Sequence, residues 1–423
     1  MNRILILIAV FTSLNAAAQN VHKCYTHEAM LHQEELTPGY LNSVEESFQR
    51  AKTSVSTDRS TVYTIPVVVH IVYNDASENL DDSVVFNQID ILNESFRRTN
   101  ADTVNMRDDY TTIVGDSYIQ FQLAQIDPSG QPTTGITRTN TTQTSFLGVG
   151  GSPAEGVKSD ADGGIDPWDQ SRYLNIWVCN MQLFSTPFLL GYASPPNNLP
   201  NWPPGSADNL SDGVVIEFEA FGSNNPNTLD LGGGPVDVEG KTCVHEVGHY
   251  LGLRHIWGDG DCTEEDGIDD TPNADDQSNQ DCDTTKNTCT DNITTLGDLP
   301  DMVENYMDYS AETCQNSFTL GQVDLMRGVL ENERIDLISG NPASISDVGE
   351  FEFNVYPNPS NGTIVIGNIP NESAYLRIFT ESGKLVKEMT INSQQKIEGL
   401  PSGLYFVQLS NEAATITKKL VVL

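Results

Sequence analysis

Apolar residues recur along the first part of the chain in an order typical of an α/β domain. Residues 65–73 form a β-branched apolar run of the kind found in buried strands. Residues 85–96 repeat apolar side chains at helical spacing, and residues 119–123 alternate apolar with polar side chains, as in a half-buried strand. Residues 173–181 and 214–218 predict further strands. This order predicts an α/β fold in which a helix backs a twisted mixed sheet.

A second helix, predicted over residues 238–251, forms the floor of this sheet. Residues 256–304 are rich in Asp, Asn, Thr and Cys, so we expect an irregular subdomain there, closed by a last helix over residues 319–338. From residue 351 onward, short strands separated by turn residues indicate a small antiparallel β-sandwich. The sandwich contains neither His nor Cys, which argues against catalysis in that unit.

The N-terminal residues have the features of an export signal. Asn2-Arg3 precede an apolar run over residues 4–11, and Ala16-Ala17-Ala18 supply small residues for cleavage. The run is too short to span a membrane, and no later stretch is long enough. The residues that follow are polar, Glu-rich and helix-prone, which indicates a propeptide. We therefore expect a signal peptide (1–18), a propeptide (19–59), a catalytic domain (60–339), a linker (340–350) and a C-terminal domain (351–423).

Acidic residues far outnumber basic ones, and the 423-residue chain has a formal net charge of −37. Nucleic acids are polyanions that require basic surfaces, so the charge argues against nucleic-acid binding. A soluble, self-repelling exported protein accounts for most of the acid. The seven cysteines of an exported chain indicate disulfides, with one thiol left over.

The most specific chemical feature is the sequence His-Glu-Val-Gly-His-Tyr-Leu-Gly-Leu-Arg-His, which runs from residue 245 to residue 255. On a helix, His245 and His249 are one turn apart and project from the same face, so both imidazoles can reach one metal ion. Gly252 can adopt a positive φ, which ends the helix and lets His255 return as a third ligand. Three nitrogen ligands leave the fourth position of zinc open, as in catalytic sites.

The alternative is an amphipathic helix with incidental histidines. The chain has only seven His, and three of them stand at these spacings together with a glutamate and a glycine. This combination is far more specific than a bare H-E-x-x-H sequence. Glu246 is too close in sequence to the two helical ligands to share the metal, but it is well placed to hold a water on it. The pattern therefore favours a catalytic zinc site.

The zinc sequence resembles that of the metzincin metallopeptidases, whose members also have a methionine turn beneath the metal. Here Met307 and Tyr309 are the candidates for that turn. Within the metzincins, the chain resembles the pappalysin family over roughly residues 60–338. The segments that carry this resemblance are Asp166–Trp168, Tyr173–Val178, the zinc sequence with Ile256–Asp259, Asp269–Pro272 and Asn305–Tyr309.

The resemblance implies a secreted zinc-dependent metalloendopeptidase that hydrolyses peptide bonds in proteins through a metal-activated water. Glu246 would be the general base, and Tyr309 would donate a hydrogen bond to the developing oxyanion. Met307 would pack beneath the metal without binding it. An edge strand near residues 191–194 is a candidate for holding an extended peptide. The alternative is a non-catalytic surface binding protein with a vestigial zinc site, which the presence of Glu246 and Tyr309 argues against.

Cys24 lies in the expected propeptide, ahead of the catalytic domain. A thiolate is a good fourth zinc ligand, and related zymogens are silenced by such a cysteine. We therefore expect Cys24 to bind the zinc in the zymogen, with activation by cleavage before the first strand, for which Arg59-Ser60 is a candidate site. An incidental free thiol is the alternative.

Acidic residues also cluster between the zinc sequence and the methionine turn. Packed carboxylates repel one another, and calcium, which prefers oxygen ligands, relieves the repulsion. This segment is similar to the calcium loop of the pappalysins, which implies Asp266 and Thr271 as ligands first, and then Asp270 and Asp275. Simple solvation of an acidic loop is the alternative.

The resemblance further implies two disulfides, Cys262–Cys289 and Cys282–Cys314, the second of which would hold the methionine turn. Cys179 and Cys243 are then left over. They could pair, since a strand and the zinc helix pack together, or they could remain two buried thiols.

The sequence carries one indication about which side chains the enzyme prefers next to the cleaved bond. Some relatives have Asp just before the cysteine that follows the methionine turn, and they prefer a basic residue after the cleaved bond. Here that position is Thr313, with Glu312 one residue earlier, so the sequence leaves a basic preference in doubt.

The C-terminal unit resembles the sorting domain of type IX secretion cargo. The segments that carry this resemblance are Tyr356–Gly362, Ser402–Tyr405 and Thr417–Leu423. It implies recognition by the type IX secretion machinery and passage through the outer membrane, with the domain often removed afterwards. We expect a monomeric enzyme that is secreted or held at the cell surface. An ordinary sugar- or protein-binding sandwich is the alternative.

Overall fold

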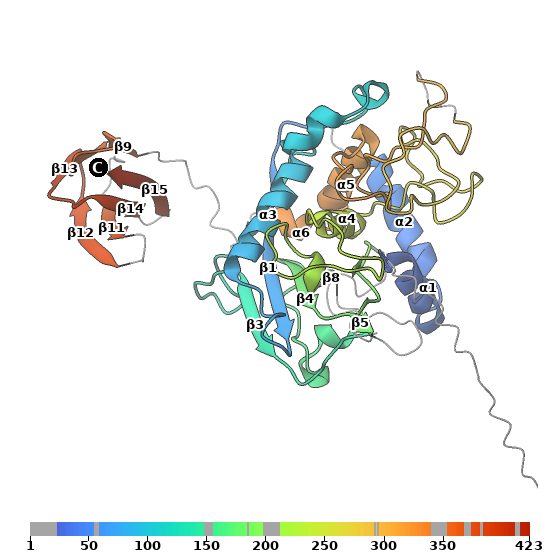
Figure 1. The fold of residues 1–423 in the computed structure, drawn as a ribbon, viewed down its shortest axis with the longest axis horizontal. Coiled ribbons are helices and arrows are strands. Elements are labelled where there is room, and N and C mark those ends of the chain that lie inside the picture. The colour runs from blue at the N-terminus through green and yellow to red at the C-terminus, as the bar shows by residue number, and fades with distance from the viewer. Residues whose placement is uncertain are drawn as a thin grey trace, which may run out of the picture. The chain divides into compact units, whose positions relative to one another are not determined.

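The computed structural model describes residues 23–54, 59–147, 155–183, 186–197, 212–291, 293, 296–339, 353–367, 374–380, 384–410 and 415–423. The chain divides into two compact units, residues 1–344 and 345–423, and each is described by itself (Figure 1). The expected signal peptide (1–18) and linker (340–350) lie outside the described residues.

A six-stranded sheet forms the centre of the first unit. Its strands are, in spatial order, β2 (Ile119–Leu123), β1 (Tyr63–Tyr73), β4 (Leu174–Cys179), β8 (Val214–Glu217) and β7 (Gly191–Ala193), and β3 (Ile136–Asn140) also pairs with β1. All pairings in this sheet are parallel except that of β7 with β8. Both faces of the sheet are covered, so β1 and β4 are buried along most or all of their length and carry continuous apolar runs. The predicted mixed sheet of an α/β fold is confirmed.

The two predicted helices of the core are α3 (Asp82–Phe96) and α4 (Lys241–Tyr250). Their apolar side chains join Ile65, Val67 and Val69 of β1 in one core, so both helices pack on the same face of the sheet. Side chains on the opposite face form a separate, smaller cluster, which includes Val72, Trp177, Cys179 and Val215.

The helix α4 starts three residues later than its apolar spacing predicts. Gly240 has a φ of 73°, in the left-handed region, so the helical backbone can begin only at Lys241. The helix α3 is capped by Asp81, whose carboxylate accepts a hydrogen bond from the Ser83 N–H at 2.9 Å.

The last helix of this unit is in fact two helices, α5 (Leu320–Asn332) and α6 (Ile335–Ile338). Thr319 and Gln322 form a capping box at the start of α5. The chain leaves the helical conformation at Arg334, whose guanidinium is buried and donates to the Tyr250 carbonyl at the end of α4 and to the carboxylate of Asp212. Arg334 therefore connects the α5–α6 break to the end of α4.

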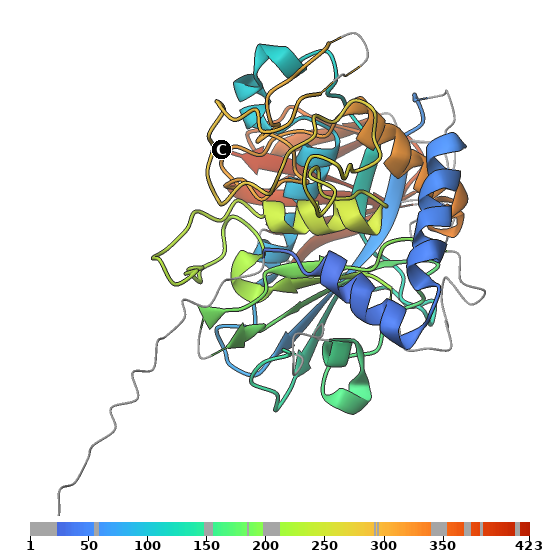
Figure 2. The same ribbon diagram turned by 90° about the vertical axis from the view of Figure 1, so that its right-hand side faces the viewer.

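Two N-terminal helices, α1 (Thr26–Leu36) and α2 (Tyr40–Thr53), cover one side of this unit (Figure 2). Gly39 joins them with a φ of 98°. Short elements complete the unit: the antiparallel pair β5 (Gln182–Leu183) and β6 (Thr186–Pro187), and 3-10 turns at Ala101–Asn105, Asp108–Tyr110, Glu155–Lys158, Asp160–Asp162 and Phe218–Ala220.

The described part of the segment between α4 and α5 contains no helix or strand and is crosslinked by Cys262–Cys289 and Cys282–Cys314, as expected. The third pairing, Cys179 with Cys243, is wrong, because both residues are buried free thiols. Cys179 belongs to the cluster on one face of the sheet and Cys243 to the core on the other face, so the sheet separates them.

The second unit contains two antiparallel sheets, which confirms the predicted sandwich. One sheet has the order β13 (Gln395–Glu398), β10 (Thr363–Gly367), β9 (Asn354–Tyr356), and the other has the order β12 (Leu385–Ile391), β11 (Ala374–Thr380), β14 (Gly403–Ser410), β15 (Thr415–Val422). Side chains of both sheets, such as Ile366, Ile397, Leu376 and Val407, share one core.

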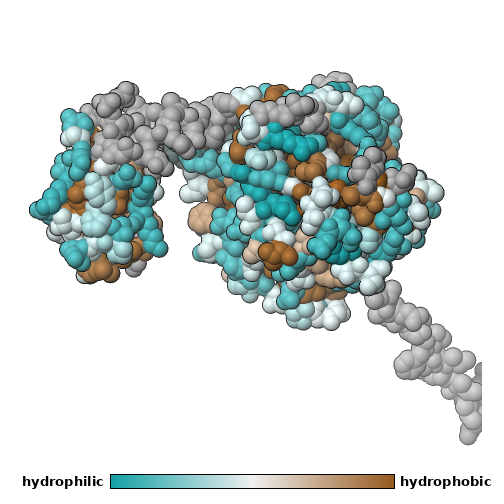
Figure 3. All heavy atoms as spheres, turned by 90° about the horizontal axis from the view of Figure 1, so that it is seen from above, coloured by the Kyte–Doolittle hydropathy of each residue, from teal (hydrophilic) through white to brown (hydrophobic). Residues whose placement is uncertain are grey.

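In the view of Figure 3, the surface of the first unit is mostly hydrophilic, with apolar residues in separate patches. Within the described residues, no helix combines the length and the apolar character needed to cross a membrane.

Candidate active site

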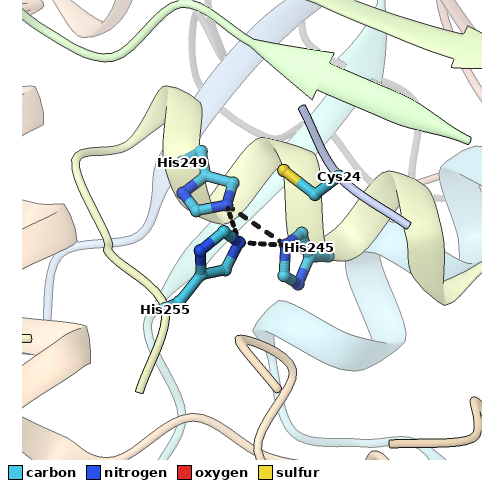
Figure 4. A group of neighbouring side chains, drawn as sticks. All are labelled: Cys24, His245, His249 and His255. Carbon is cyan, nitrogen blue, oxygen red and sulfur yellow. Dashed lines mark hydrogen bonds between the residues drawn. The ribbon is translucent and has the colours of Figure 1, made fainter. Parts of the chain in front are cut away.

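The helix α4 and the turn after it bring three imidazoles together (Figure 4). His245 and His249 project from one face of α4, and Gly252, with a φ of 91°, turns the chain so that His255 returns beside them. The Nε2 atom of His249 lies 3.1 Å from the Nε2 atoms of both His245 and His255, which are 3.3 Å from each other. All three side chains are buried.

Each ring is fixed by an acceptor at its Nδ1–H, on the side away from the other rings. The pairs are His245 with the Tyr306 carbonyl at 2.7 Å, His249 with the Leu253 carbonyl at 2.8 Å and His255 with the Asp259 carboxylate at 2.5 Å. These acceptors have no proton to give, so Nδ1 carries the hydrogen and the three Nε2 lone pairs face one another. Burial also lowers the pKa values of His245 and His249, the latter to about 3, which keeps both rings neutral.

Three lone pairs that face one another repel unless a cation lies between them. Tetrahedral nitrogen ligands of zinc are about 3.3–3.4 Å apart, since the Zn–N distance is about 2.0–2.1 Å. The observed separations of 3.1–3.3 Å are close to this value. The three histidines therefore fit a zinc ion, with a fourth position left for another ligand.

Glu246 follows the first histidine on α4 and is fully buried. Burial raises the pKa of its carboxyl to about 8, into the range useful for general acid–base catalysis. A Cβ atom at Gly191 in β7 would lie 2.7 Å from Cγ and 2.9 Å from Oε1 of Glu246. Only glycine at 191 therefore leaves room for this carboxylate beside the sheet edge.

The methionine turn lies directly against α4. A Cβ atom at Gly248 would lie 2.5 Å from the sulfur of Met307, so glycine at this position allows the turn to approach the helix. The ring of Tyr309 lies over the site, with its centroid 5.0 Å from that of His255 and 5.6 Å from that of His245. Burial raises the pKa of Tyr309, so its hydroxyl keeps the proton and can donate it in a hydrogen bond.

Cys24 reaches this site from the N-terminal segment (Figure 4). Its sulfur and the nitrogens of the three histidines all lie within 4.8 Å of one another. The Tyr309 hydroxyl donates to the Cys24 carbonyl at 3.2 Å, and the Thr26 hydroxyl donates to the Glu246 carboxylate at 3.1 Å. The same short segment therefore contacts the metal ligands, the buried glutamate and the tyrosine.

The segment from Lys23 to Thr26 also runs beside β7. The Tyr25 N–H donates to the Gly191 carbonyl at 3.0 Å, and the Ala193 N–H donates to the Thr26 hydroxyl at 2.9 Å. The edge strand β7 thus holds the chain just before α1 through one backbone hydrogen bond and one bond to a side chain.

Lys23 is buried next to the methionine turn. Its ammonium donates to the Ser310 carbonyl at 2.7 Å and lies 5.9 Å from the centre of the Tyr309 ring. Burial lowers the pKa of Lys23, and the carboxylates of Glu312 and Asp308 oppose this effect. The Lys23 ammonium is therefore buried among acidic side chains, and we call its surroundings, formed by Asp308, Ser310 and Glu312, the acidic pocket.

Glu312 has a second role that sequence reasoning missed. Its carboxylate accepts from the Lys241 N–H at 3.2 Å, and from the N–H and the hydroxyl of Thr242 at 2.7 Å each, all at the start of α4. The residue before the helix is glycine and offers no side-chain cap. A carboxylate from the methionine-turn loop thus accepts two of the free N–H groups at the start of α4. No local pattern in the sequence predicts this long-range cap.

Asp259 was also missed as the acceptor that orients His255. It follows that histidine by four residues, a spacing visible in the sequence, and adopts a φ of 61°, which aspartate tolerates better than most residues. Its other carboxylate oxygen lies 3.2 Å from Nδ1 of His27 in α1.

The four expected calcium ligands fall into two groups. Asp266, Asp270 and Thr271 each have a buried side-chain oxygen without a hydrogen-bond partner, which is a donor set that suits a hard cation. Burial raises the pKa of Asp266 to about 8 and also raises that of Asp270. Asp275 is exposed beside the Cys262–Cys289 disulfide and forms no cluster with the other two aspartates within the described residues.

Comparison with known proteins places this site in a family. Residues 234–331 match the model of the pregnancy-associated plasma protein-A peptidases, and residues 354–423 match that of the secretion system C-terminal sorting domain. The chain is 26% identical over 292 residues to an extracellular metalloprotease of Arthroderma gypseum, covering 68% of this chain and 79% of that protein. It is 36% identical over 134 residues to an extracellular metalloprotease of Uncinocarpus reesii, covering 32% of this chain and 40% of that protein.

Two solved structures resemble the first unit. Mature mirolysin from Tannerella forsythia, in complex with a cleaved peptide, is 39% identical, with a TM-score of 0.56 over 66% of this chain and 96% of that one. A mutant of promirolysin from the same organism is 36% identical, with a TM-score of 0.61 over 75% of this chain and 97% of that one. The chain therefore belongs to the pappalysin family of zinc metalloendopeptidases and carries a type IX secretion sorting domain at its C-terminus.

Proposed function

We propose that the chain is the secreted zymogen of a zinc metalloendopeptidase in which Glu246 is the general base. The observation that carries this proposal is the convergence of three imidazoles, a buried carboxylate and a phenol on one point beside the edge strand β7. When bound, zinc would polarise the scissile carbonyl and acidify the attacking water. Glu246 then takes a proton from that water and returns it to the leaving amine.

Tyr309 and β7 position the substrate in this proposal. The Tyr309 hydroxyl already donates to a peptide carbonyl, that of Cys24, above the histidines. A substrate carbonyl in that place would receive the same hydrogen bond as its oxygen gains negative charge. The backbone of Gly191 and Ala193 would hold the extended substrate, as it holds the segment from Lys23 to Thr26.

We propose that Cys24 silences the enzyme before the propeptide is cleaved. Its sulfur lies at the fourth side of the histidine cluster, where it would displace the attacking water. Burial and the Glu246 carboxylate raise the pKa of the Cys24 thiol, and a bound divalent cation would reverse this shift and favour the thiolate. Cleavage near Arg59-Ser60 would remove the segment 19–59 and leave the catalytic domain, residues 60–339. A signal peptide at residues 1–18 and a monomeric mature enzyme, released or kept at the outer membrane, complete the proposal.

The pocket that holds Lys23 supports a preference for basic side chains in the substrate. Asp308 and Glu312 supply the negative charge, and the Ser310 carbonyl supplies an acceptor, although the residue before Cys314 is Thr313. Removal of the propeptide would free this pocket for a lysine or arginine next to the cleaved bond.

We also propose a structural calcium ion at Asp266, Asp270 and Thr271. The support is their three buried oxygens without partners, which a calcium ion would satisfy. Asp275 is too exposed to join them without movement of its loop, so it is a weaker candidate.

Replacement of Glu246 tests the general base. Glu246→Ala should lower casein hydrolysis by the processed protein by about a thousandfold, since general base catalysis contributes roughly 10²–10⁴. Elemental analysis should still find one zinc per chain. The control is Glu94→Ala on the exposed side of α3, which should keep full activity. Zinc binding with no hydrolysis by either the wild type or the control would instead identify a non-catalytic binding protein.

Replacement of Cys24 tests the latency. Uncleaved Cys24→Ala should hydrolyse a short quenched peptide faster than the uncleaved wild type, because water regains the fourth position. Cys179→Ala, which changes a buried thiol on the face of the sheet opposite α4, is the control and should stay latent. Equal latency of Cys24→Ala and wild type would refute the switch.

A peptide library tests the acidic pocket. The processed enzyme should cleave next to Lys or Arg at least about tenfold more often than next to Leu, because a buried charge is favoured only when it is paired. Thr313→Asp adds a carboxylate to the same loop, next to Glu312, and should increase this ratio. A library profile without enrichment of basic residues would show that the pocket serves the propeptide alone.

Calcium removal tests the acidic loop. The melting temperature should fall on treatment with EGTA and recover with calcium but not with zinc, whereas Asp266→Asn should melt lower and respond less. In EGTA, the raised pKa of Asp266 means that the folded state binds a proton the unfolded state has lost between pH about 4 and 8. Stability should therefore fall across this window as pH rises, and less so in Asp266→Asn. An identical calcium response in both proteins would exclude this site.

A further inference from the structure

The helix α5 packs along α2 of the proposed propeptide (Figure 2), and the two backbones come very close at Gly328. A Cβ atom at Gly328 would lie 2.2 Å from the carbonyl oxygen of Ala51 and 2.9 Å from its carbonyl carbon. The nearest atoms all belong to Ala51, and Gly328 does not have a positive φ. Glycine inside a helix costs about 1 kcal/mol relative to alanine. The close approach of α2 therefore explains glycine at this position.

An apolar stripe of α2 is buried at this contact. Val44, Phe48 and Ala51 are at most 7% exposed, although α2 as a whole is a polar helix. Phe48 and Ala51 belong to the same apolar core as Leu253 and Val329 of the catalytic domain. Removal of the propeptide would uncover that part of the core.

Charged pairs surround the stripe. Arg50 donates to both oxygens of Glu333, at 2.5 and 3.1 Å, and the Glu333 carboxylate is only 7% exposed. Lys52 donates to the Asp269 carboxylate and to the Gly267 carbonyl, each at 2.8 Å. Two basic residues of α2 thus form ion pairs with carboxylates of the catalytic domain.

This contact does not include the three histidines, although α2 also contacts Arg254, the neighbour of His255, through the Glu45 carboxylate at 2.5 Å and through the Phe48 ring. A cavity of about 450 Å³ lies between α2 and the histidines, lined by Val44 and Phe48 of α2 and by His249 and His255 of the site. None of the polar contacts of α2 described above involves a histidine or Glu246. The propeptide therefore has two anchors, of which only one includes Cys24.

We propose that the surface around Gly328, with Glu333 and Asp269, is a docking site of the mature enzyme for its own excised propeptide. The inference rests on the proposed zymogen function. After cleavage, α2 would remain on α5 and hold the segment from Lys23 to Thr26 at a high effective concentration next to the zinc ligands. Cleavage would then be only the first step of activation, and the free propeptide would inhibit the enzyme in trans.

Binding of a labelled fragment tests this site. The probe is a fluorescein-labelled peptide of residues 23–54 with Cys24→Ala, so that no thiol can bind the metal. It should bind the processed wild-type enzyme, and Gly328→Ala should weaken binding at least 30-fold while hydrolysis of a short peptide substrate stays within twofold. Gly233→Ala is the matched control, because a Cβ atom there meets nothing within 4 Å, and it should bind like the wild type.

A charge exchange makes the test independent of the glycine. The fragment with Arg50→Glu should bind wild-type enzyme weakly, and the enzyme with Glu333→Arg should restore its binding. Equal binding to wild type and Gly328→Ala, no binding to either, or no rescue by the exchange would overturn the proposal. Latency of the uncleaved chain is measured separately, so its absence would defeat the zymogen function, whereas latency without fragment binding would defeat this inference alone.

Discussion

The site depends on one constraint: three imidazole rings must present their Nε2 lone pairs to the same point. Two backbone carbonyls and one carboxylate enforce this orientation, because they accept the Nδ1–H groups on the opposite side of each ring. These acceptors come from the methionine turn and from the turn after α4, which is why the fold must close around the helix before the site exists. Gly252, with its left-handed backbone, and the buried Arg334, which donates to the last turn of α4, also help to hold the three rings in place.

The sequence predicted the chemistry of the site better than its support. The three histidines, Glu246 and Tyr309 are recognisable because spacing along one helix and a known family resemblance determine them. The mixed sheet followed from runs of β-branched residues, and the sandwich followed from short strands. The bounds of α4 and of the α5–α6 break did not follow, because a left-handed glycine and a buried arginine override the apolar spacing there.

Contacts between residues far apart in the sequence could not be predicted. Glu312 caps a helix that begins about seventy residues earlier. The need for glycine at position 328 becomes visible only when α2 is packed against α5. The proposed Cys179–Cys243 pair failed for the same reason, since strand order decides which face of the sheet each thiol occupies. The two correct disulfides were predicted from the family resemblance, which carries three-dimensional information from known structures.

The contact between Gly248 and the sulfur of Met307 has a consequence for variation at these positions. A larger residue at either one occupies the space of the other, so the two cannot change independently. In a library of random variants, the residues tolerated at position 248 should therefore depend on the residue at position 307. The combined volume of the two side chains should decide which pairs still fold.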